Sequence, residues 1–151
     1  RGVEAGAEVI VSPTYHQPVI DECTRLNVSV FPGAYTPTEV LICWFDDKDS
    51  EERKPQVDGV KVFPTEGRTT IIKEIRAPIS YVPLVPTGGC TADNVYQFIM
   101  AGGKGNAPVV PGIGNNVFNP DIIAAGNWKA LTSVAKRVHD EVNHAHKDLA
   151  V

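Results

Sequence analysis

Cysteine, methionine, basic clusters and long apolar runs are all scarce in this 151-residue chain. The three cysteines, Cys23, Cys43 and Cys90, lie far apart and form no CxxC pair. We therefore expect free thiols in a reducing compartment and no metal site built from them. No apolar run approaches the ~20 residues that cross a bilayer. The net charge of −4 argues against nucleic acid or an anionic membrane as the main partner.

The chain begins Arg-Gly-Val-Glu, and its one methionine is Met100. Because the start has neither methionine nor a signal-like segment, we expect that part of the natural protein precedes it. The hydrophobic content of 42% is enough for one domain with a sizeable core, so residues 1–151 are treated as a single domain. A cytoplasmic location is expected, and an organelle matrix such as that of a plastid fits the same features.

Short β-rich runs recur along the chain, and each ends in a cluster of proline, glycine, serine or threonine. These runs lie at 8–13, 28–34, 59–64, 81–89 and 107–114. Helical patterns follow them at 17–26, 36–45, 68–76, from Thr91 to a stop at Gly102–Gly103, and at 127–148. Thr36 and Glu39 form a capping box at the second helix. The alternation predicts a parallel sheet flanked by helices, an α/β fold.

Polar and glycine-rich residues gather after each run rather than before it. In α/β folds this carboxyl edge of the sheet carries the site. One interval does not fit the alternation of strands and helices. It is the charged stretch 46–58, which we interpret as a solvated surface loop. The two tryptophans, Trp44 and Trp128, are interpreted as packing anchors.

Lys61 stands in the middle of the third run, between two valines. Because successive side chains of a strand point to opposite faces, Lys61 shares a face with Phe63, and Val60 and Val62 share the other. If the valines face the helices, the lysine points into the interior of the sheet or barrel, where burial disfavours its ammonium form. A neutral amine is the nucleophile of Schiff-base chemistry on a carbonyl. The alternatives are an edge-strand lysine that reaches water and an internal ion pair.

Two glycine-rich turns follow the fourth and fifth runs. "VPTGG" (85–89) offers the hydroxyl of Thr87 and two glycines that let the backbone approach a ligand, just before a helix N-terminus that can bind phosphate or carboxylate. "PGIGNN" (111–116) repeats this pattern with Gly112 and Gly114. Such turns after the last two strands are typical of phosphate sites in (β/α)8 barrels. The alternative for either turn is a tight connection that binds nothing.

Other candidates are weaker. Glu66, just past the lysine run, could support the lysine site or begin the next helix. His16 follows the first run and could face the pocket. The three histidines of the last helix fit no metal-ligand pattern and are expected to be solvated; they are His139, His144 and His146.

Five stretches together resemble the class I 2-keto-3-deoxy-6-phosphogluconate (KDPG) aldolase family, which includes the 4-hydroxy-2-oxoglutarate (KHG) aldolases. They are "GAEVIVSP", "PGAYTPTE", "VKVFPTE", "VPTGG" and the last glycine-rich turn. "KVFPTE" is similar to the family's KFFPAE, and "PTGG" matches outright. The motifs occur in family order over nearly the whole chain. The resemblance implies a (β/α)8 TIM barrel, usually a trimer, in which the five runs are strands 4 to 8.

The same resemblance implies a site for a small 2-keto acid, with no metal and no cofactor. It places the Schiff-base lysine at Lys61. It places the threonine that meets the keto-acid carboxylate at Thr87, and phosphate-binding glycines at Gly88 and Gly89. The remaining implied substrate-binding residues are Pro64, Gly114 and Asn116. The family's catalytic glutamate and substrate-binding arginines belong to its first three βα units, which we expect before the residues given.

Two departures from the family pattern stand out. Asn116 occupies the place of a serine that contacts phosphate, although an asparagine amide can also donate to a phosphate oxygen. The interval 46–58 is longer than in the family.

The implied reaction is cleavage of KDPG to pyruvate and glyceraldehyde 3-phosphate. The alternatives are cleavage of KHG to pyruvate and glyoxylate, or a catalytically silent barrel fragment with a structural role, since five βα units leave open sheet edges.

Overall fold

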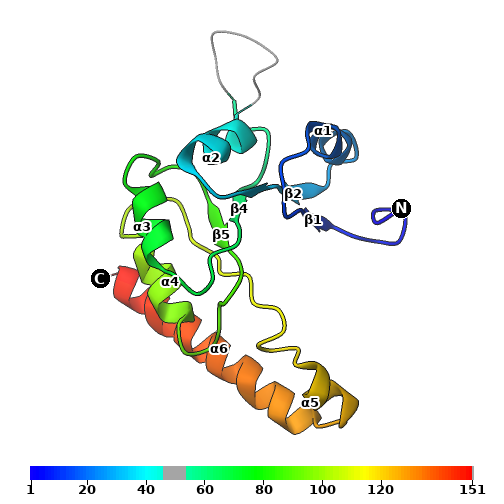
Figure 1. Cartoon of the computed structure of the whole chain (residues 1–151), viewed down its shortest axis with the longest axis vertical. Coiled ribbons are helices and arrows are strands. Elements are labelled where there is room, and N and C mark those ends of the chain that lie inside the picture. Colours follow the sequence, from blue (N-terminus) through cyan, green and yellow to red (C-terminus); the bar gives the residue numbers. More distant parts are fainter. Residues whose placement is uncertain (46–53, 151) are drawn as a thin grey trace.

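The computed structural model describes residues 1–45 and 54–150, in which parallel strands alternate with helices (Figure 1). The strands are β1 (Val9–Val11), β2 (Ser29–Phe31), β3 (Gly33–Ala34), β4 (Val60–Val62) and β5 (Leu84–Pro86). The helices are α1 (Gln17–Arg25), α2 (Pro37–Trp44), α3 (Thr70–Arg76), α4 (Val95–Ala101), α5 (Pro120–Ala124) and α6 (Trp128–Ala150). The predicted α/β order is confirmed.

Within each of two sheets, strands that are neighbours along the chain pair in parallel. β1 pairs with β2, and β3, β4 and β5 form a second sheet in that order. Pro32 separates β2 from β3 because its nitrogen has no N–H to donate. Its carbonyl nevertheless accepts the backbone amide of Lys61 at 2.8 Å. The two sheets therefore meet at Pro32.

The fifth predicted strand is less regular than expected. The segment 107–114 is held against β5 by two isolated parallel bridges, at Val109 and Gly112. Pro108 and Pro111 lack the N–H that a continuous ladder needs. The segment thus lies beside β5 as predicted, but it forms bridges instead of a strand.

Several helix boundaries follow the signals in the sequence. α2 begins after Thr36, and the capping box between Thr36 and Glu39 is formed. α4 ends at Ala101, directly before Gly102 and Gly103. Gly103 has a φ of +75°, a conformation that glycine adopts without a steric penalty. These predictions are confirmed.

The predicted start of α4 is wrong. A turn separates Thr91 from the helix, which begins at Val95 without a side-chain cap. The side chain of Asn94 instead accepts the backbone amide of Thr91 at 2.8 Å. Threonine and asparagine both favour such local bonds, so the same residues that can cap a helix here form a turn before it.

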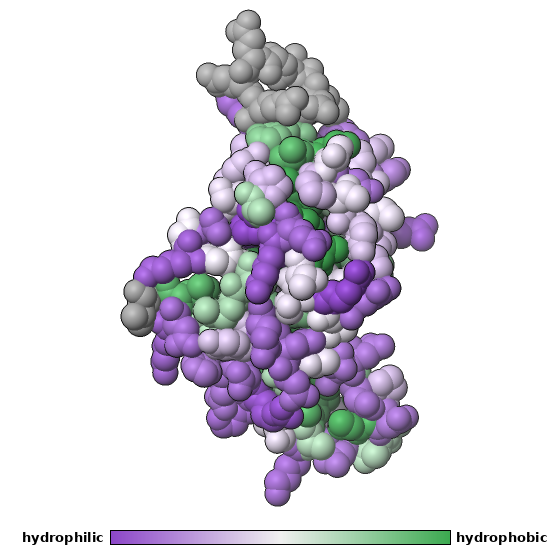
Figure 2. Space-filling view, turned by 60° about the vertical axis from the view of Figure 1, so that its left-hand side comes forward, coloured by the Kyte–Doolittle hydropathy of each residue, from purple (hydrophilic) through white to green (hydrophobic). Residues whose placement is uncertain are grey.

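The two faces of the sheet differ in their cover. Val60 and Val62 are fully buried, at 0% exposure, in the core between the strands and the helices. On the opposite face Val9, Val11 and Val110 remain 51%, 52% and 58% exposed. On the face that Figure 2 shows, most of the described surface is hydrophilic, with hydrophobic side chains gathered in a few separate patches. The described helices thus cover only one face of the sheet.

Arg76, which the sequence did not single out, is buried at the end of α3. Its guanidinium donates to four carbonyl oxygens at 2.8 to 3.2 Å, those of Ile79, Ser80, Val82 and Ala107. Burial lowers its pKa. The side chain joins residues 79–82, which precede β5, to the start of the bridging segment 107–114. Carbonyl oxygens of both stretches accept hydrogen bonds from it.

The remaining predictions concern the tryptophans, the cysteines, the charged interval and the absence of a membrane span. Trp44 packs in the core, but Trp128 is 60% exposed, so its role as a packing anchor was wrong. All three cysteines are free and buried. Residues 46–53 of the charged interval lie outside the described residues, and Pro55 pairs antiparallel with Phe45. Within the described part of the chain, none of the helices has the length and apolar character needed to cross a membrane.

Candidate active site

Lys61 lies at the centre of the three-stranded sheet. It pairs with Gly33 of β3 on one side and with Val85 of β5 on the other. Its two valine neighbours are fully buried, whereas Lys61 itself is half-buried and faces away from the helices. The predicted alternation is confirmed, and the edge-strand alternative is wrong because β4 has a strand on each side.

The lysine amine has an aromatic neighbour instead of an acidic one. Lys61 Nζ lies 4.8 Å from the centroid of the Phe63 ring. Among residues 1–45 and 54–150, no carboxylate forms an ion pair with it, which removes the internal-ion-pair alternative for that part of the chain. Glu66 lies 3.5 Å from Arg68 instead, and both side chains are exposed. No described carboxylate therefore forms an ion pair with the amine.

The loop after β4 is attached to the turn after β5 by a buried threonine. Thr65 Oγ1 donates to the carbonyl oxygen of Gly88 at 2.6 Å and lies 3.2 Å from that of Thr87. The Thr65 amide donates to the Thr87 carbonyl at 2.9 Å, and the Gly67 amide to the Gly88 carbonyl at 3.0 Å. Sequence reasoning missed Thr65, since a threonine beside a proline and a glycine is typical of an exposed turn.

The "VPTGG" turn has the backbone that its glycines predict. Gly88 and Gly89 have φ values of +97° and +73°. A Cβ added to Gly89 would lie 2.3 Å from the Gly67 nitrogen, so only glycine fits there. Neither amide N–H of this pair donates to an acceptor within the described residues. Two unpaired donors in a glycine turn are the arrangement that binds an anion.

The last glycine-rich turn lies against the first. A Cβ on Gly112 would meet Thr87 Oγ1 at 2.7 Å, which places the two turns in close contact. The Asn116 side chain reaches back and donates its Nδ2 to the Cys90 carbonyl at 2.9 Å. Gly114, between these contacts, has open space around it. The structure therefore brings the two predicted turns together.

Cys90 directly follows the glycine pair, but it is not a second nucleophile. Burial raises the pKa of its thiol to about 11. A thiol is a nucleophile only as the thiolate, so Cys90 is inert near neutral pH. Its Sγ lies 3.4 Å from the Pro86 carbonyl, which it can bond as a weak donor.

Most predicted site residues thus lie at one edge of the sheet. Lys61 is on β4, Pro64 follows it through a cis peptide bond, and the two glycine turns follow β5 and the last bridging segment. His16 is different: it is exposed, at the start of α1, and makes no side-chain cap. No cluster of three or more potential metal ligands occurs among the described residues.

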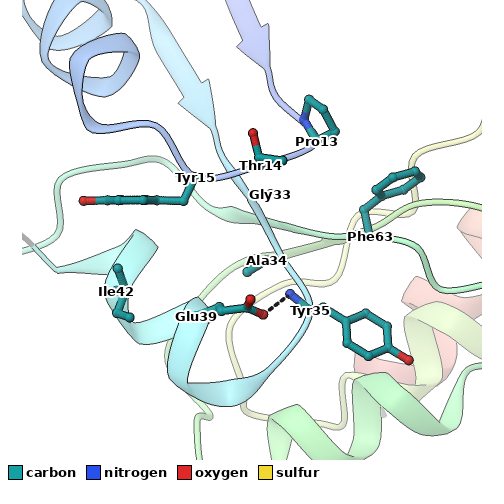
Figure 3. Close-up of a pocket in the computed structure, with 9 residues that line it drawn as sticks. All are labelled: Pro13, Thr14, Tyr15, Gly33, Ala34, Tyr35, Glu39, Ile42 and Phe63. Atoms are coloured by element: carbon teal, nitrogen blue, oxygen red, sulfur yellow. Dashed lines mark hydrogen bonds between the residues drawn. The ribbon is translucent and has the colours of Figure 1, made fainter.

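A hollow of about 320 Å³ opens beside β3, next to the Phe63 ring (Figure 3). Its walls are the loop after β1 (13–15), residues 33–35, two side chains of α2, Glu39 and Ile42, and the Phe63 ring. We call it the Phe63 hollow. No local pattern in the sequence predicts it, because it is formed by three separate segments.

The chain is similar to proteins of one family. A family model described as KDPG and KHG aldolase matches residues 1–134. The chain is 28% identical over 138 residues to a 2-dehydro-3-deoxy-phosphogluconate aldolase of Treponema pallidum (strain Nichols), covering 88% of this chain and 58% of that protein. It is 27% identical over 136 residues to a KHG/KDPG aldolase of Escherichia coli (strain K12), covering 88% and 57%.

A solved structure described as native KDPGal has the same fold. It matches with a TM-score of 0.73 at 20% identity, covering 95% of this chain and 62% of that one. The chain therefore spans about three fifths of the length of the proteins it matches.

Proposed function

Because the chain belongs to the KDPG and KHG aldolase family, we propose that Lys61 is the Schiff-base nucleophile of an aldolase that cleaves a 2-keto acid. The observation that carries the proposal is the position of this amine. It lies on the uncovered face of the central strand, beside two glycine turns, and no described carboxylate neutralises it. A nucleophilic amine needs access to a carbonyl and freedom from an ion pair, and Lys61 has both.

The reaction follows from the chemistry of the amine. Lys61 Nζ adds to the C2 ketone to form a carbinolamine, which loses water to give a protonated imine. A base takes the C4 hydroxyl proton, the C3–C4 bond breaks, and its electron pair moves into the imine to form an enamine. The aldehyde leaves, C3 takes a proton, and water hydrolyses the imine to release pyruvate and the amine. We assign this base to none of the described residues.

The two glycine turns are proposed to hold the anionic groups of the substrate. Thr87 would meet the carboxylate, and Gly88 and Gly89 would bind phosphate through their amides. Pro64, Gly114 and Asn116 would complete the wall. The positive φ values of the glycine pair and its unpaired N–H groups support this assignment.

The proposed substrate is KDPG, with pyruvate and glyceraldehyde 3-phosphate as products. KHG, which would give pyruvate and glyoxylate, is the alternative, and the Escherichia coli relative is named for both. Kinetics on the phosphorylated and unphosphorylated substrates separate the two.

We further propose that the five predicted runs are strands 4 to 8 of a (β/α)8 barrel, with β2 and β3 together forming one of them and the bridging segment 107–114 the last, in a protein that assembles as a trimer. Two observations support the barrel. The strands are parallel and in chain order, and the valines on the uncovered face are half exposed, as the inside of an unfinished barrel would be. The trimer follows from the family resemblance.

Borohydride trapping with pyruvate tests the function. The full chain should form a covalent adduct that peptide mass mapping places on Lys61, because borohydride reduces the imine to a stable amine. Lys61→Met should form none. Lys73→Met, an exposed lysine on α3, is the matched control and should be labelled like the parent. Absence of an adduct on Lys61 would overturn the aldolase proposal and favour a silent barrel with a structural role.

A further inference from the structure

In the turn after β5, the carbonyl oxygens of residues 87–90 all accept hydrogen bonds from the protein. The first two accept from the loop after β4. The third, that of Gly89, accepts from Asn94 Nδ2 at 2.9 Å, and the fourth accepts from Asn116 Nδ2 at 2.9 Å. These peptide bonds are trans, so the C=O and N–H of each point in opposite directions. Each bond to a carbonyl therefore also sets the direction of the N–H that follows it.

Three successive N–H groups of the turn, those of Gly88, Gly89 and Cys90, donate to no acceptor within the described residues. The third is the most informative, because Cys90 is only 2% exposed. A backbone N–H at such a position normally has a partner, since leaving it unpaired costs free energy. A bound anion would supply that partner, and successive backbone N–H groups form the kind of concavity that binds one.

Asn94 sets the position of the third donor. Its Nδ2 holds the Gly89 carbonyl at 2.9 Å, and its Oδ1 accepts the Thr91 amide at 2.8 Å. These two groups belong to the peptides on either side of Cys90. One side chain thus fixes both peptides, and the Cys90 N–H lies between its two bonds.

Two acidic side chains belong to segments next to this turn, and both are paired with arginines. Glu66, in the loop that packs on the turn, lies 3.5 Å from Arg68. Asp93, directly before Asn94, forms an ion pair with Arg137 of α6. The arginines offset these negative charges, so neither acid leaves an unpaired carboxylate beside an anion in the turn.

We propose that Asn94 is a positioning residue whose side chain completes a phosphate-binding site in this turn, with the Cys90 N–H as its third donor. The inference rests on the proposed function and concerns the substrate class of the same site. A phosphate monoester presents three terminal oxygens, which three N–H groups held in place can match. Without the Asn94 donor, the Gly89–Cys90 peptide is free to turn its N–H away. Asn94 thereby favours a phosphorylated 2-keto acid without touching it.

Two measurements on the full chain separate this role from the Schiff base. Isothermal titration calorimetry with glycerol 3-phosphate, a phosphate monoester without a carbonyl, reports on the turn, and borohydride trapping of pyruvate reports on Lys61. Asn94→Ala removes both bonds and adds no charge. Asn94→Asp keeps an acceptor for the Thr91 amide but has no donor for the Gly89 carbonyl. Each should weaken glycerol 3-phosphate binding by roughly tenfold or more, because a hydrogen bond to a charged group is lost, and should trap pyruvate like the parent.

The matched control is Asn106→Ala. Asn106 Nδ2 also donates to a glycine carbonyl, that of Gly102 at 2.7 Å, but beyond the other end of α4. This variant should bind glycerol 3-phosphate like the parent. The loss that both Asn94 variants share is then the loss of the donor to the Gly89 carbonyl.

The outcomes distinguish the two proposals. Weaker glycerol 3-phosphate binding in both Asn94 variants, with normal trapping and a normal Asn106→Ala, supports the inference. Unchanged binding in either Asn94 variant, an equal loss in the control, or a loss of trapping together with binding overturns it. A parent that traps pyruvate but does not bind glycerol 3-phosphate also overturns it and leaves the Schiff-base function standing. A parent that traps no pyruvate overturns the aldolase function, and the calorimetry still decides whether Asn94 positions a phosphate site.

Discussion

The two sides of Lys61 are built in different ways. On the β5 side, the loop after β4 and the glycine turn share four hydrogen bonds through Thr65, Gly67 and their partners, and the backbone leaves no room for a side chain at Gly89. On the β1 side, side chains from three segments enclose a hollow, and several of them are exposed. The difference teaches that backbone hydrogen bonds fix the geometry of one side of Lys61, while side chains shape the other.

The largest expected effect is on the tightly packed β5 side. Gly89→Ala should lower the free energy of unfolding by about 3 kcal/mol, because the new Cβ would lie 2.3 Å from the Gly67 nitrogen at a φ of +73°. Urea denaturation measures the change. Gly114→Ala is the matched control: it has open space and should stay within about 0.5 kcal/mol of the parent. Equal effects of the two changes would mean that the β5 turn is not constrained.

The next effect comes from the hydroxyl that joins the two loops. Thr65→Val keeps the shape of the side chain but removes the hydroxyl donor from the part-buried Gly88 and Thr87 carbonyls, which keep their backbone amide donors, and leaves the fully buried position without a polar group. We expect a loss of about 1–3 kcal/mol in the free energy of unfolding, again from urea denaturation. Thr65→Ser, which keeps the hydroxyl, should recover most of it. A variant with valine that is as stable as the parent would contradict the role of this bond.

On the β1 side, Glu39 holds the start of α2, and its contribution should depend on pH. Hydrogen bonds from the Tyr35 and Thr36 amides lower the pKa of its carboxyl from 4.5. A lowered carboxyl pKa stabilises the fold above pH 4.5, and this contribution is lost as the pH falls through the lowered value. Glu39→Gln should therefore cost about 0.5–1 kcal/mol at pH 7 and nothing in strong acid.

Thermal unfolding from pH 7 down to pH 3 measures whether the stability of Glu39→Gln approaches that of the parent as the pH falls. Glu74→Gln, an exposed glutamate on α3 without a capping role, should differ little from the parent at any pH. A Glu39→Gln difference that stays constant with pH would show that the carboxylate charge does not matter.

The smallest effect concerns the exposed rim. Tyr35→Phe removes the 2.8 Å bond that its hydroxyl accepts from Arg68. Because the Arg68 side chain is 53% exposed, water replaces the bond, and we expect a change within about 0.5 kcal/mol in urea denaturation. Arg68→Met removes the same bond and should match it. A loss above 1 kcal/mol in either variant would mean that the β1 side is as constrained as the β5 side.

The sequence predicted the parts of the site that depend on local rules. The alternation around Lys61, the capping box at Thr36 and the positive-φ glycines after β5 each follow from a few neighbouring residues. It did not predict Thr65 or Arg76, since both look like surface residues and are buried only because the chain folds over them: Thr65 bonds the turn after β5, and Arg76 bonds carbonyls of both residues 79–82 and Ala107. The misplaced cap at Thr91 has a local origin, because the Asn94 side chain three residues later bonds the Thr91 backbone amide.

Asn116 stands where the family resemblance implies a serine, and the two side chains differ in the hydrogen bonds they can donate. A serine hydroxyl has a single proton to give, whereas an asparagine amide has two. Asn116 directs one bond to the Cys90 carbonyl. One residue can thereby hold the last turn in place and keep a second N–H for its proposed role in binding.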